Sequence, residues 1–185
     1  MLNFNSQCRK ANLSDNVEAI AKYLHLTDAY IYPRICEEPL DKNWINLVNA
    51  CMREEHNIFN VQHLSVALRN NNIVGVLCVI PCGTVLKFAN NLNDIVPKEF
   101  LDRLKPVIDG YFAPLISESL SYSGYNITNV CVDDKHQNQG VGGLLLSRCI
   151  EEYGTYPIHL DVIASNANAI RLYKNFGFEI SNEKG

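Results

Sequence analysis

Three glycines stand within four residues of the segment 136–146, HQNQGVGGLLL, and a run of leucines follows them. Glycine costs conformational entropy inside a helix, so its place at the start of an apolar helix needs a reason. The first amides of a helix have no partner within the helix and carry partial positive charge. Gly140, Gly142 and Gly143 leave those amides accessible, which indicates a site for a phosphate group. Close packing of the helix against a neighbouring element is the alternative explanation.

Two common phosphate-binding motifs do not fit this segment. A nucleoside-triphosphate loop requires Gly-Lys-Ser/Thr, and no lysine follows Gly143. A dinucleotide-binding motif requires G-x-G-x-x-G, and here the third glycine comes directly after the second. A phosphate-bearing ligand of another class and close packing of the helix therefore both remain open at this point.

A second motif begins 24 residues after Gly142 and completes the pattern. Residues 137–142, QNQGVG, fit Q/R-x-x-G-x-G/A, and residues 166–179, NANAIRLYKNFGFE, are close to N-x-x-A-x-x-L-Y-x-x-x-G-F. In this order they resemble the coenzyme A-binding motifs of the GNAT acetyltransferase superfamily, over residues 125–180. Two residues depart from the usual pattern, since Gln137 replaces an arginine and Asp134 a proline. The resemblance implies an N-acetyltransferase of a bacterial type that uses acetyl-CoA and no metal.

The resemblance also implies which residues hold acetyl-CoA. The amide of Val130 would polarise the acetyl carbonyl, and the pantetheine arm would lie along the strand that ends at Val132. Asn166 would hold the pantetheine or, alternatively, only cap the last helix. The pyrophosphate would lie on the amides of a loop formed by Gln137, Asn138, Gln139, Gly140, Val141, Gly142 and Gly143.

Tyr173 is the candidate catalytic residue, because the resemblance places its hydroxyl at the sulfur. A tyrosine with a pKa of ~10 is protonated at neutral pH and can protonate a leaving thiolate whose thiol has a pKa of ~8.5. The alternative is an aromatic residue of the core, since Leu172, Phe176 and Phe178 around it are apolar.

The general base is not evident from the sequence. Deprotonating a lysine-like amine with a pKa of ~10.4 costs ~4.6 kcal/mol at pH 7, whereas an α-amine with a pKa of ~7.8 costs about 1 kcal/mol. Some relatives carry a glutamate where this chain has Asn126, which cannot accept the proton. A non-catalytic, regulatory acyl-CoA-binding module is therefore the alternative function. The remaining candidate bases are Asp133, Asp134, His136, Glu37 and Glu38.

The elements that position these residues follow from periodicity and from turn residues. Their order, β-α-α-β-β-(insert)-β-α-β-α-β, predicts a mixed α/β fold in a single domain over residues 1–185. The resemblance adds a GNAT-like, mostly antiparallel central sheet, splayed between the fourth and fifth strands, with helices on both faces. We expect strands at 7–11, 125–132, 156–164 and 178–181, a hairpin at 64–80 around Asn70-Asn71-Asn72, helices after Ser14 or Asp15, at 141–154 and at 166–177, two short helices in 26–56, and an insert at 84–122 containing a helix at 97–112.

The composition limits the partners of the protein. A net charge of −4 without a basic run argues against nucleic acid and anionic membranes, and no segment approaches membrane-spanning length. Seven cysteines, an odd number without a C-x-x-C pair, indicate a reduced, cytoplasmic protein.

The acceptor is expected to be a primary amine of a small molecule or peptide. Aromatic residues that could line its pocket are Tyr30, Tyr32, Trp44, Tyr111 and Phe112.

The end of the chain raises a question about the sheet. In the superfamily a seventh strand normally inserts between the fifth and sixth, and here the sequence ends after residues 178–181. We expect either the sixth strand or a second copy of the chain to pair with the fifth strand, since buried amides are rarely left unpaired. The second possibility predicts a homodimer.

Overall fold

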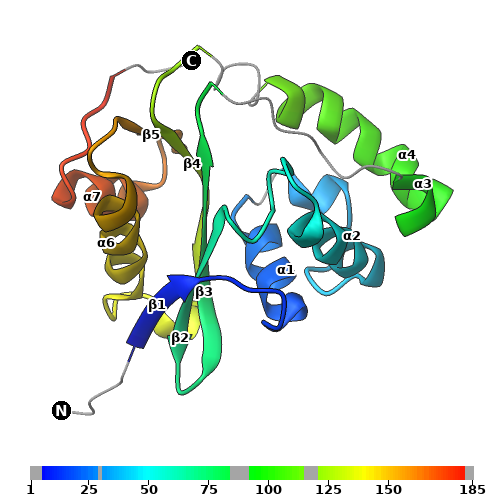
Figure 1. Cartoon of the computed structure of the whole chain (residues 1–185), viewed down its shortest axis with the longest axis horizontal. Helices are drawn as coiled ribbons and strands as arrows, with labels where there is room; N and C mark the ends of the chain where they lie inside the picture. Colours follow the sequence, from blue (N-terminus) through cyan, green and yellow to red (C-terminus); the bar gives the residue numbers. More distant parts are fainter. Residues whose placement is uncertain (1–5, 29–30, 84–91, 115–120, 182–185) are drawn as a thin grey trace.

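A central sheet separates two helical layers (Figure 1). The computed structural model describes residues 6–28, 31–83, 92–114 and 121–181. In these residues five strands follow the order β1-β2-β3-β4-β5, and all neighbours are antiparallel except β4 and β5. The strands are β1 (Ser6–Lys10), β2 (Leu64–Arg69), β3 (Asn72–Pro81), β4 (Tyr125–Val132) and β5 (Ile158–Leu160).

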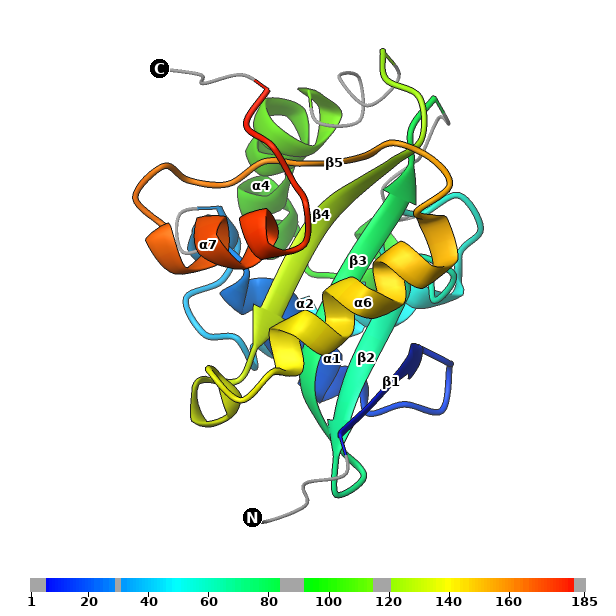
Figure 2. The same ribbon diagram turned by 90° about the vertical axis from the view of Figure 1, so that its left-hand side faces the viewer.

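Helices cover both faces of the sheet, as predicted. Helices α1, α2, α3 and α4 lie on one side, and α6 and α7 lie on the other, where they face the viewer in Figure 2. The α-helices are α1 (Val17–Leu26), α2 (Lys42–Arg53), α3 (Leu92–Ile95), α4 (Lys98–Val107), α6 (Val141–Tyr153) and α7 (Ala167–Asn175). Shorter turns are the 3-10 helices η1 (Tyr32–Arg34) and η3 (Asp134–His136) and the π-helical turn η2 (Ile108–Phe112).

Each face of the sheet has its own apolar core. Residues of α2 spaced three and four apart, Trp44, Leu47 and Cys51, are fully buried against the first face. On the second face, Val141 and Leu145 of α6 pack on strands β2 to β4. Burial of these stripes holds the helices to the sheet at about 25 cal/mol per Å² of apolar surface.

The hairpin β2–β3 confirms the predicted turn, with one change. Asn70 and Asn71 have positive φ angles of 50° and 62°, which is the geometry of a two-residue turn between antiparallel strands. Asn72 already belongs to β3 and pairs with Arg69. The turn therefore contains two asparagines and not three.

The cap of α1 differs from the prediction. Asn16 is the N-cap, and its side chain accepts a hydrogen bond from the amide of Ala19 at 3.0 Å. Asp15 instead accepts two hydrogen bonds from the guanidinium of Arg9, at 2.6 and 2.8 Å. The tertiary ion pair with β1 thus takes Asp15 away from the helix, and the next polar residue caps it.

The insert contains the predicted helix, but the helix changes type partway. Helix α4 begins after Pro97 and contains Pro106, which has no amide to donate to the helical ladder. The π-helical turn η2 follows directly and carries Tyr111. Residues 84–91 and 115–120 of the insert lie outside the described residues.

A bulge in β4 produces the splay of the sheet. Ile127 pairs with Val79 of β3 and Asn129 pairs with the preceding residue, Cys78, so Thr128 is an extra residue on β4. Parallel pairing with β5 extends only from Tyr125 to Ile127 and ends at this bulge. The fourth and fifth strands therefore diverge, which confirms the predicted splay.

The last part of the chain departs from the prediction. The expected fifth strand at 156–164 is reduced to Ile158–Leu160, and residues 178–181 form no strand. The amide of Phe178 instead closes the end of α7 by donating to the carbonyl of Tyr173 at 3.1 Å. Of the alternating apolar residues in this segment, Phe178 packs on the core while Ile180 is 58% exposed, so the pattern does not bury a continuous face. The expected pairing of a sixth strand with β5 is thus not formed by residues 178–181.

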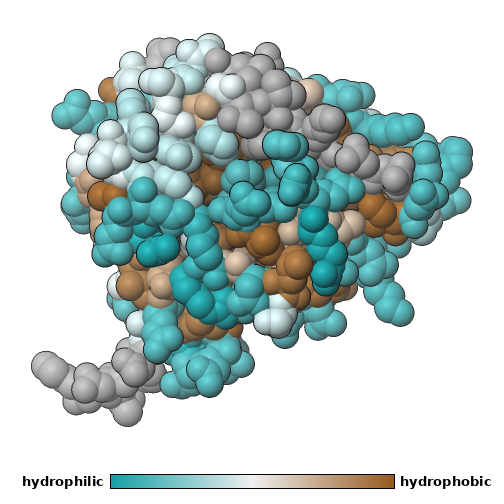
Figure 3. All heavy atoms as spheres, viewed as in Figure 1, coloured by the Kyte–Doolittle hydropathy of each residue, from teal (hydrophilic) through white to brown (hydrophobic). Residues whose placement is uncertain are grey.

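Polar side chains cover most of the face shown in Figure 3, and apolar ones gather in its middle, between the helical layers. All seven cysteines are free thiols in this structure, and the reduced state expected from the sequence stays a prediction. None of the described helices is long and apolar enough to cross a bilayer.

Candidate active site

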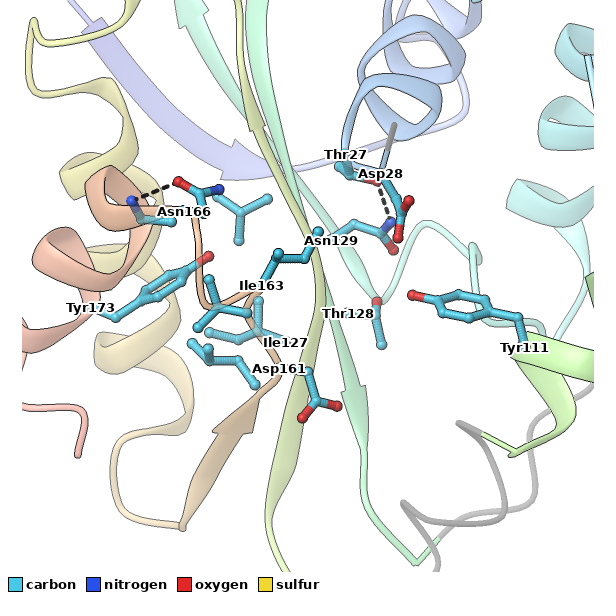
Figure 4. Close-up of a pocket in the computed structure, with 14 residues that line it drawn as sticks. Thr27, Asp28, Tyr111, Ile127, Thr128, Asn129, Asp161, Ile163, Asn166 and Tyr173 are labelled. Carbon is cyan, nitrogen blue, oxygen red and sulfur yellow. Dashed lines mark hydrogen bonds between the residues drawn. The ribbon is translucent and has the colours of Figure 1, made fainter. Parts of the chain in front are cut away.

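A pocket lies where β4 and β5 diverge (Figure 4). Its walls come from β4, from the segment after β5, from α7, from the end of α1 and from the turn η2. The lining residues are Thr27, Asp28, Tyr111, Ile127, Thr128, Asn129, Val130, Leu160, Asp161, Val162, Ile163, Asn166, Ala169 and Tyr173.

The bulge decides which way the amides of β4 point. The amide of Tyr125 donates to Pro157 beside β5 at 2.9 Å, whereas the amide of Asp133 donates to Val74 of β3 at 2.9 Å. In a regular strand two residues eight apart point the same way, because the period is two. The extra residue Thr128 reverses this order, so the amides of Val130 and Val132 face away from β3, toward the edge that β5 leaves open.

Asn129 fixes this part of β4 to the first helical layer. Its side chain is buried and donates to the hydroxyls of Thr27 at 2.8 Å and Tyr32 at 2.9 Å. The end of α1 is thereby held against β4. The adjacent residue Val130 lines the pocket and packs with the apolar core on the α6 side.

Tyr173 reaches the pocket from α7, on the side opposite Tyr111 (Figure 4). Its ring packs edge-on against Phe178, with 5.8 Å between the ring centroids. Burial raises the pKa of the Tyr173 hydroxyl above its ordinary value. The hydroxyl is therefore protonated at neutral pH and available as a proton donor.

Asn166 caps α7 and lines the same pocket. Its Oδ1 accepts a hydrogen bond from the amide of Ala169 at 3.1 Å. The capping explanation for this residue is thus correct, and its position also allows contact with a ligand.

The three glycines before α6 have different structural roles. Gly140 is the N-cap with a positive φ of 84°, and a Cβ added there would meet no atom within 4 Å. A Cβ on Gly142 would lie 3.1 Å from Leu172, and one on Gly143 would lie 3.4 Å from Phe176. Gly142 and Gly143 therefore allow α6 to pack closely on α7. Gly140 provides the turn and leaves the first amides of α6 uncovered.

The loop before α6 is held by its own glutamines. Gln137 donates to the carbonyl of Val132 at 3.1 Å and to the carboxylate of Asp134 at 2.8 Å. Gln139 donates to the carbonyl of Lys135 at 2.8 Å and accepts a hydrogen bond from Arg69 of β2. Arg69 is buried and was not predicted for this site, because no local pattern connects β2 with a loop 70 residues later.

None of the five candidate bases lines the pocket. Asp133 accepts hydrogen bonds from Lys22 at 3.2 Å and Tyr23 at 3.1 Å. Burial alone would raise the pKa of Asp133, but these bonds and the amide of Lys135 outweigh it and lower the pKa to about 2. Such a carboxylate is a poor proton acceptor at neutral pH. Glu37 and Glu38 are exposed between η1 and α2.

The predicted acceptor aromatics divide into core and pocket residues. Tyr32, Trp44 and Phe112 are buried in the core, where their rings contact one another and Phe59. Tyr111 alone among the described aromatics of this set lines the pocket. Tyr30 lies outside the described residues.

Two carboxylates in the pocket, Asp28 and Asp161, were not predicted as site residues. A lone aspartate in a loop is usually a solvated surface residue, so the sequence carries no signal for either. The fold brings them to one pocket because α1 ends beside the bulge of β4 and Asp161 directly follows β5.

The family model described as Acetyltransferase (GNAT) family matches residues 22–178. The chain belongs to the GNAT family. This confirms the resemblance seen in residues 125–180 and extends it to most of the sequence.

Sequence relatives of this GNAT protein are similar over a short segment. The [ribosomal protein bS18]-alanine N-acetyltransferase of Escherichia coli strain K12 is 45% identical over 53 residues, which cover 27% of this chain and 36% of the relative. The L-amino acid N-acetyltransferase AaaT of the same strain is 40% identical over 55 residues, covering 28% and 34%. The chain thus matches about a third of the length of these relatives.

Structural similarity extends over nearly the whole GNAT chain. The crystal structure of an N-acetyltransferase from Staphylococcus aureus Mu50 has a TM-score of 0.72, with 19% sequence identity and coverage of 97% of this chain and 93% of that one. At this identity the likeness supports the fold and not the acceptor. It confirms the predicted GNAT-like sheet.

Proposed function

We propose that the protein transfers the acetyl group of acetyl-CoA to a primary amine of a small molecule or peptide. The observation that carries this proposal is the open edge of β4. There the amides of Val130 and Val132 face away from β3, and Val130 lines the pocket that also contains Tyr173. Hydrogen-bond donors and a protonated hydroxyl around one cavity are what acyl transfer requires.

The residues present fit acetyl-CoA at both of its ends. The edge from Thr128 to Val132, which no described strand pairs on the β5 side, offers amides and carbonyls at strand spacing, and this suits the amide groups of pantetheine. The N-terminus of α6 has no side-chain cap, and Gly140 adds no atom that would cover it, which suits the pyrophosphate. When bound, acetyl-CoA supplies the thioester whose carbonyl carbon the amine attacks.

Residues of the chain then have separate tasks. The Val130 amide donates to the carbonyl oxygen as negative charge develops on it. A new carbon–nitrogen bond forms and the carbon–sulfur bond breaks. Tyr173 gives its hydroxyl proton to the departing sulfur, while the amine loses a proton to water or to a carboxylate of the pocket. An acceptor that arrives as an ammonium must first lose another proton to solvent, which costs about 1 kcal/mol at pH 7 for an α-amine and makes such an amine the easier acceptor.

A regulatory acyl-CoA-binding module without turnover is the alternative, because Asn126 occupies a position where a base would be expected. Asn126 is buried, and its neighbours in the sheet are Ile80 and His159. Thiol release from acetyl-CoA, measured over a panel of amines together with coenzyme A binding by calorimetry, separates the two functions. Amine-dependent thiol release supports the transferase. Binding without release for every amine supports the module.

A further inference from the structure

The charged residues that line the pocket in the described part of the chain are all negative. Its lining residues include two carboxylates, Asp28 and Asp161, and none of the described lining residues is a lysine, arginine or histidine. A ligand group inside this pocket therefore meets negative charge, without a facing cation among the lining residues that the structure describes.

The two carboxylates enter from different elements. Asp28 follows the end of α1, and its Oδ1 accepts a hydrogen bond from the amide of Ile31 at 2.9 Å, which fixes its orientation. Asp161 follows β5 and has no hydrogen-bond or ion-pair partner within the described part of the chain. Figure 4 shows them on two sides of the cavity, with Tyr111 on its wall.

Both carboxylates affect the pKa of the Tyr111 hydroxyl. Burial, and then the negative charges of Asp28 and Asp161, raise the pKa of its hydroxyl above the ordinary value. Both carboxylates thus act on the same part of the pocket. Asp28 is half-buried, so it repels like charges and attracts opposite ones more strongly than it would in bulk water, whereas solvent screens the exposed Asp161 more.

This field distinguishes two kinds of amine. A protonated amine approaching the pocket is attracted by the carboxylates. A free α-amino acid carries, one carbon from its amine, a carboxylate that would be repelled and would find no cation to pair with among the described lining residues. The names of the two relatives described above refer to an alanine of a ribosomal protein and to L-amino acids, so these relatives leave both kinds of amine open.

We propose that Asp28 and Asp161 select an amine whose neighbouring carbon bears no carboxylate, as in a peptide N-terminus or an aliphatic amine, and exclude free α-amino acids. This inference rests on the proposed acetyl transfer and specifies its acceptor class.

The test compares L-alaninamide with L-alanine, which differ in one charge. Because the carboxylate of alanine also raises the pKa of its amine, the informative quantity is the change in the preference when a pocket charge is removed. The preference is the ratio of kcat/KM for alaninamide to kcat/KM for alanine. It is measured in the unmodified protein, in Asp28→Asn, in Asp161→Asn and in the double variant. Asp94→Asn on α3 changes the same net charge outside the pocket lining and serves as the control.

We expect the unmodified protein to prefer alaninamide by more than tenfold. Each pocket variant should reduce the preference about threefold and the double variant about tenfold, while Asp94→Asn leaves it unchanged. A preference that is the same in the double variant and the unmodified protein overturns the inference, as does equal use of both substrates. Butylamine is the third substrate and distinguishes an aliphatic acceptor from a peptide-like one. A higher kcat/KM for butylamine than for alaninamide indicates an aliphatic amine, and the reverse indicates a peptide N-terminus.

A separate binding measurement keeps this inference distinct from the proposed function. The dissociation constants of alaninamide and alanine are measured by calorimetry in the presence of coenzyme A, for the same variants. If no amine releases thiol, acetyl transfer is overturned, and the binding ratio still decides the inference. A binding preference for alaninamide that falls in the double variant supports the charge selection, and an unchanged ratio overturns it.

Discussion

Tyr173 combines a packing contact with a position at the open edge of β4. Its ring touches Phe178, and its hydroxyl lies in the pocket with Val130 and Asn166. The two explanations from the sequence, proton donor and core aromatic, therefore concern different parts of one side chain. Removing only the hydroxyl separates them.

We expect Tyr173→Phe to lower kcat by tenfold or more, with little change in the KM for acetyl-CoA and in the melting temperature. The ring contact with Phe178 is kept, and only the proton donor is lost. Steady-state kinetics and thermal unfolding measure the two effects. A lower melting temperature with an unchanged kcat per folded molecule would show that the residue is structural.

Substitution of Gly142 tests the proposed phosphate site, and a second variant must separate this effect from the loss of packing between α6 and α7. A Cβ there would lie 3.1 Å from the end of the Leu172 side chain, so even alanine disturbs the contact between α6 and α7 slightly. We expect Gly142→Ala to bind coenzyme A within a few-fold of the unmodified protein and Gly142→Asp to lose binding, because its carboxylate repels the phosphate at close range. Calorimetry measures the affinities and thermal unfolding the stability. Equal loss in both variants would attribute the effect to packing.

At the scale of elements, two sets of side-chain hydrogen bonds hold the loop before α6 and the end of β4 in place. Arg69 of β2 donates to Gln139, and Lys22 and Tyr23 of α1 donate to Asp133 at the end of β4. The first link joins the glycine loop to the sheet. The second joins the loop to the opposite helical layer. Both connect residues more than 60 positions apart.

We expect Gln139→Ala to weaken coenzyme A binding about three- to tenfold and to leave kcat nearly unchanged. Loss of the hydrogen bond from a buried, charged arginine loosens the loop that is proposed to hold the pyrophosphate, and such bonds contribute about 1.5–3 kcal/mol where water is excluded. Gln139 is exposed and water competes for this bond, so we expect a loss below this range, about 0.7–1.4 kcal/mol, which corresponds to three- to tenfold. Gln7→Ala, an exposed glutamine on the edge strand β1, is the control. An unchanged affinity in Gln139→Ala would refute the positioning role of this link.

The Asp133 link predicts a dependence of stability on pH. The folded pKa of Asp133 is about 2, below its ordinary value of 3.8, so the ionised form is stabilised in the folded state. Its contribution, about 1 kcal/mol for a partly exposed group, is present above pH 4 and is lost as the pH falls toward 2. We expect Asp133→Asn to lower the free energy of unfolding at pH 7 and to have a smaller effect at pH 3. Denaturant unfolding at both pH values, with the exposed Asp109→Asn as a control, measures this; an equal effect at both pH values would contradict it.

For the whole molecule, the sheet edge at β5 bears on the assembly. β5 pairs with β4, and no other described strand lies beside it. The homodimer expected from the sequence stays a prediction. Light scattering at micromolar concentration should give twice the chain mass of 20.9 kDa, and a clean monomer mass would exclude a stable dimer.

Local patterns predicted the parts of the fold that depend on neighbouring residues. The strand 125–132, the helix after Gly140 and the asparagine turn of the hairpin agree with the structure. Each is set by alternation, by a capping residue or by a residue that tolerates positive φ. The motif positions 137–143, 166 and 173 also come from local spacing, within β4–loop–α6 for the first group and within α7 and its N-cap for the other two, and their binding and catalytic roles stay predictions.

Tertiary structure alone decided the remaining features. One extra residue at Thr128 turns the Val130 amide to the open edge, and an apolar pattern does not reveal a shift of one residue in pairing. Asp28 and Asp161 meet in one pocket although 133 positions separate them, and Asp15 pairs with Arg9 instead of capping α1. Residues 178–181 alternate like a strand, yet they do not pair, because a strand needs a partner edge and a buried face. These outcomes depend on the free energy of contacts between distant segments. A local stretch of sequence does not determine that free energy, because it does not include both partners of the contact.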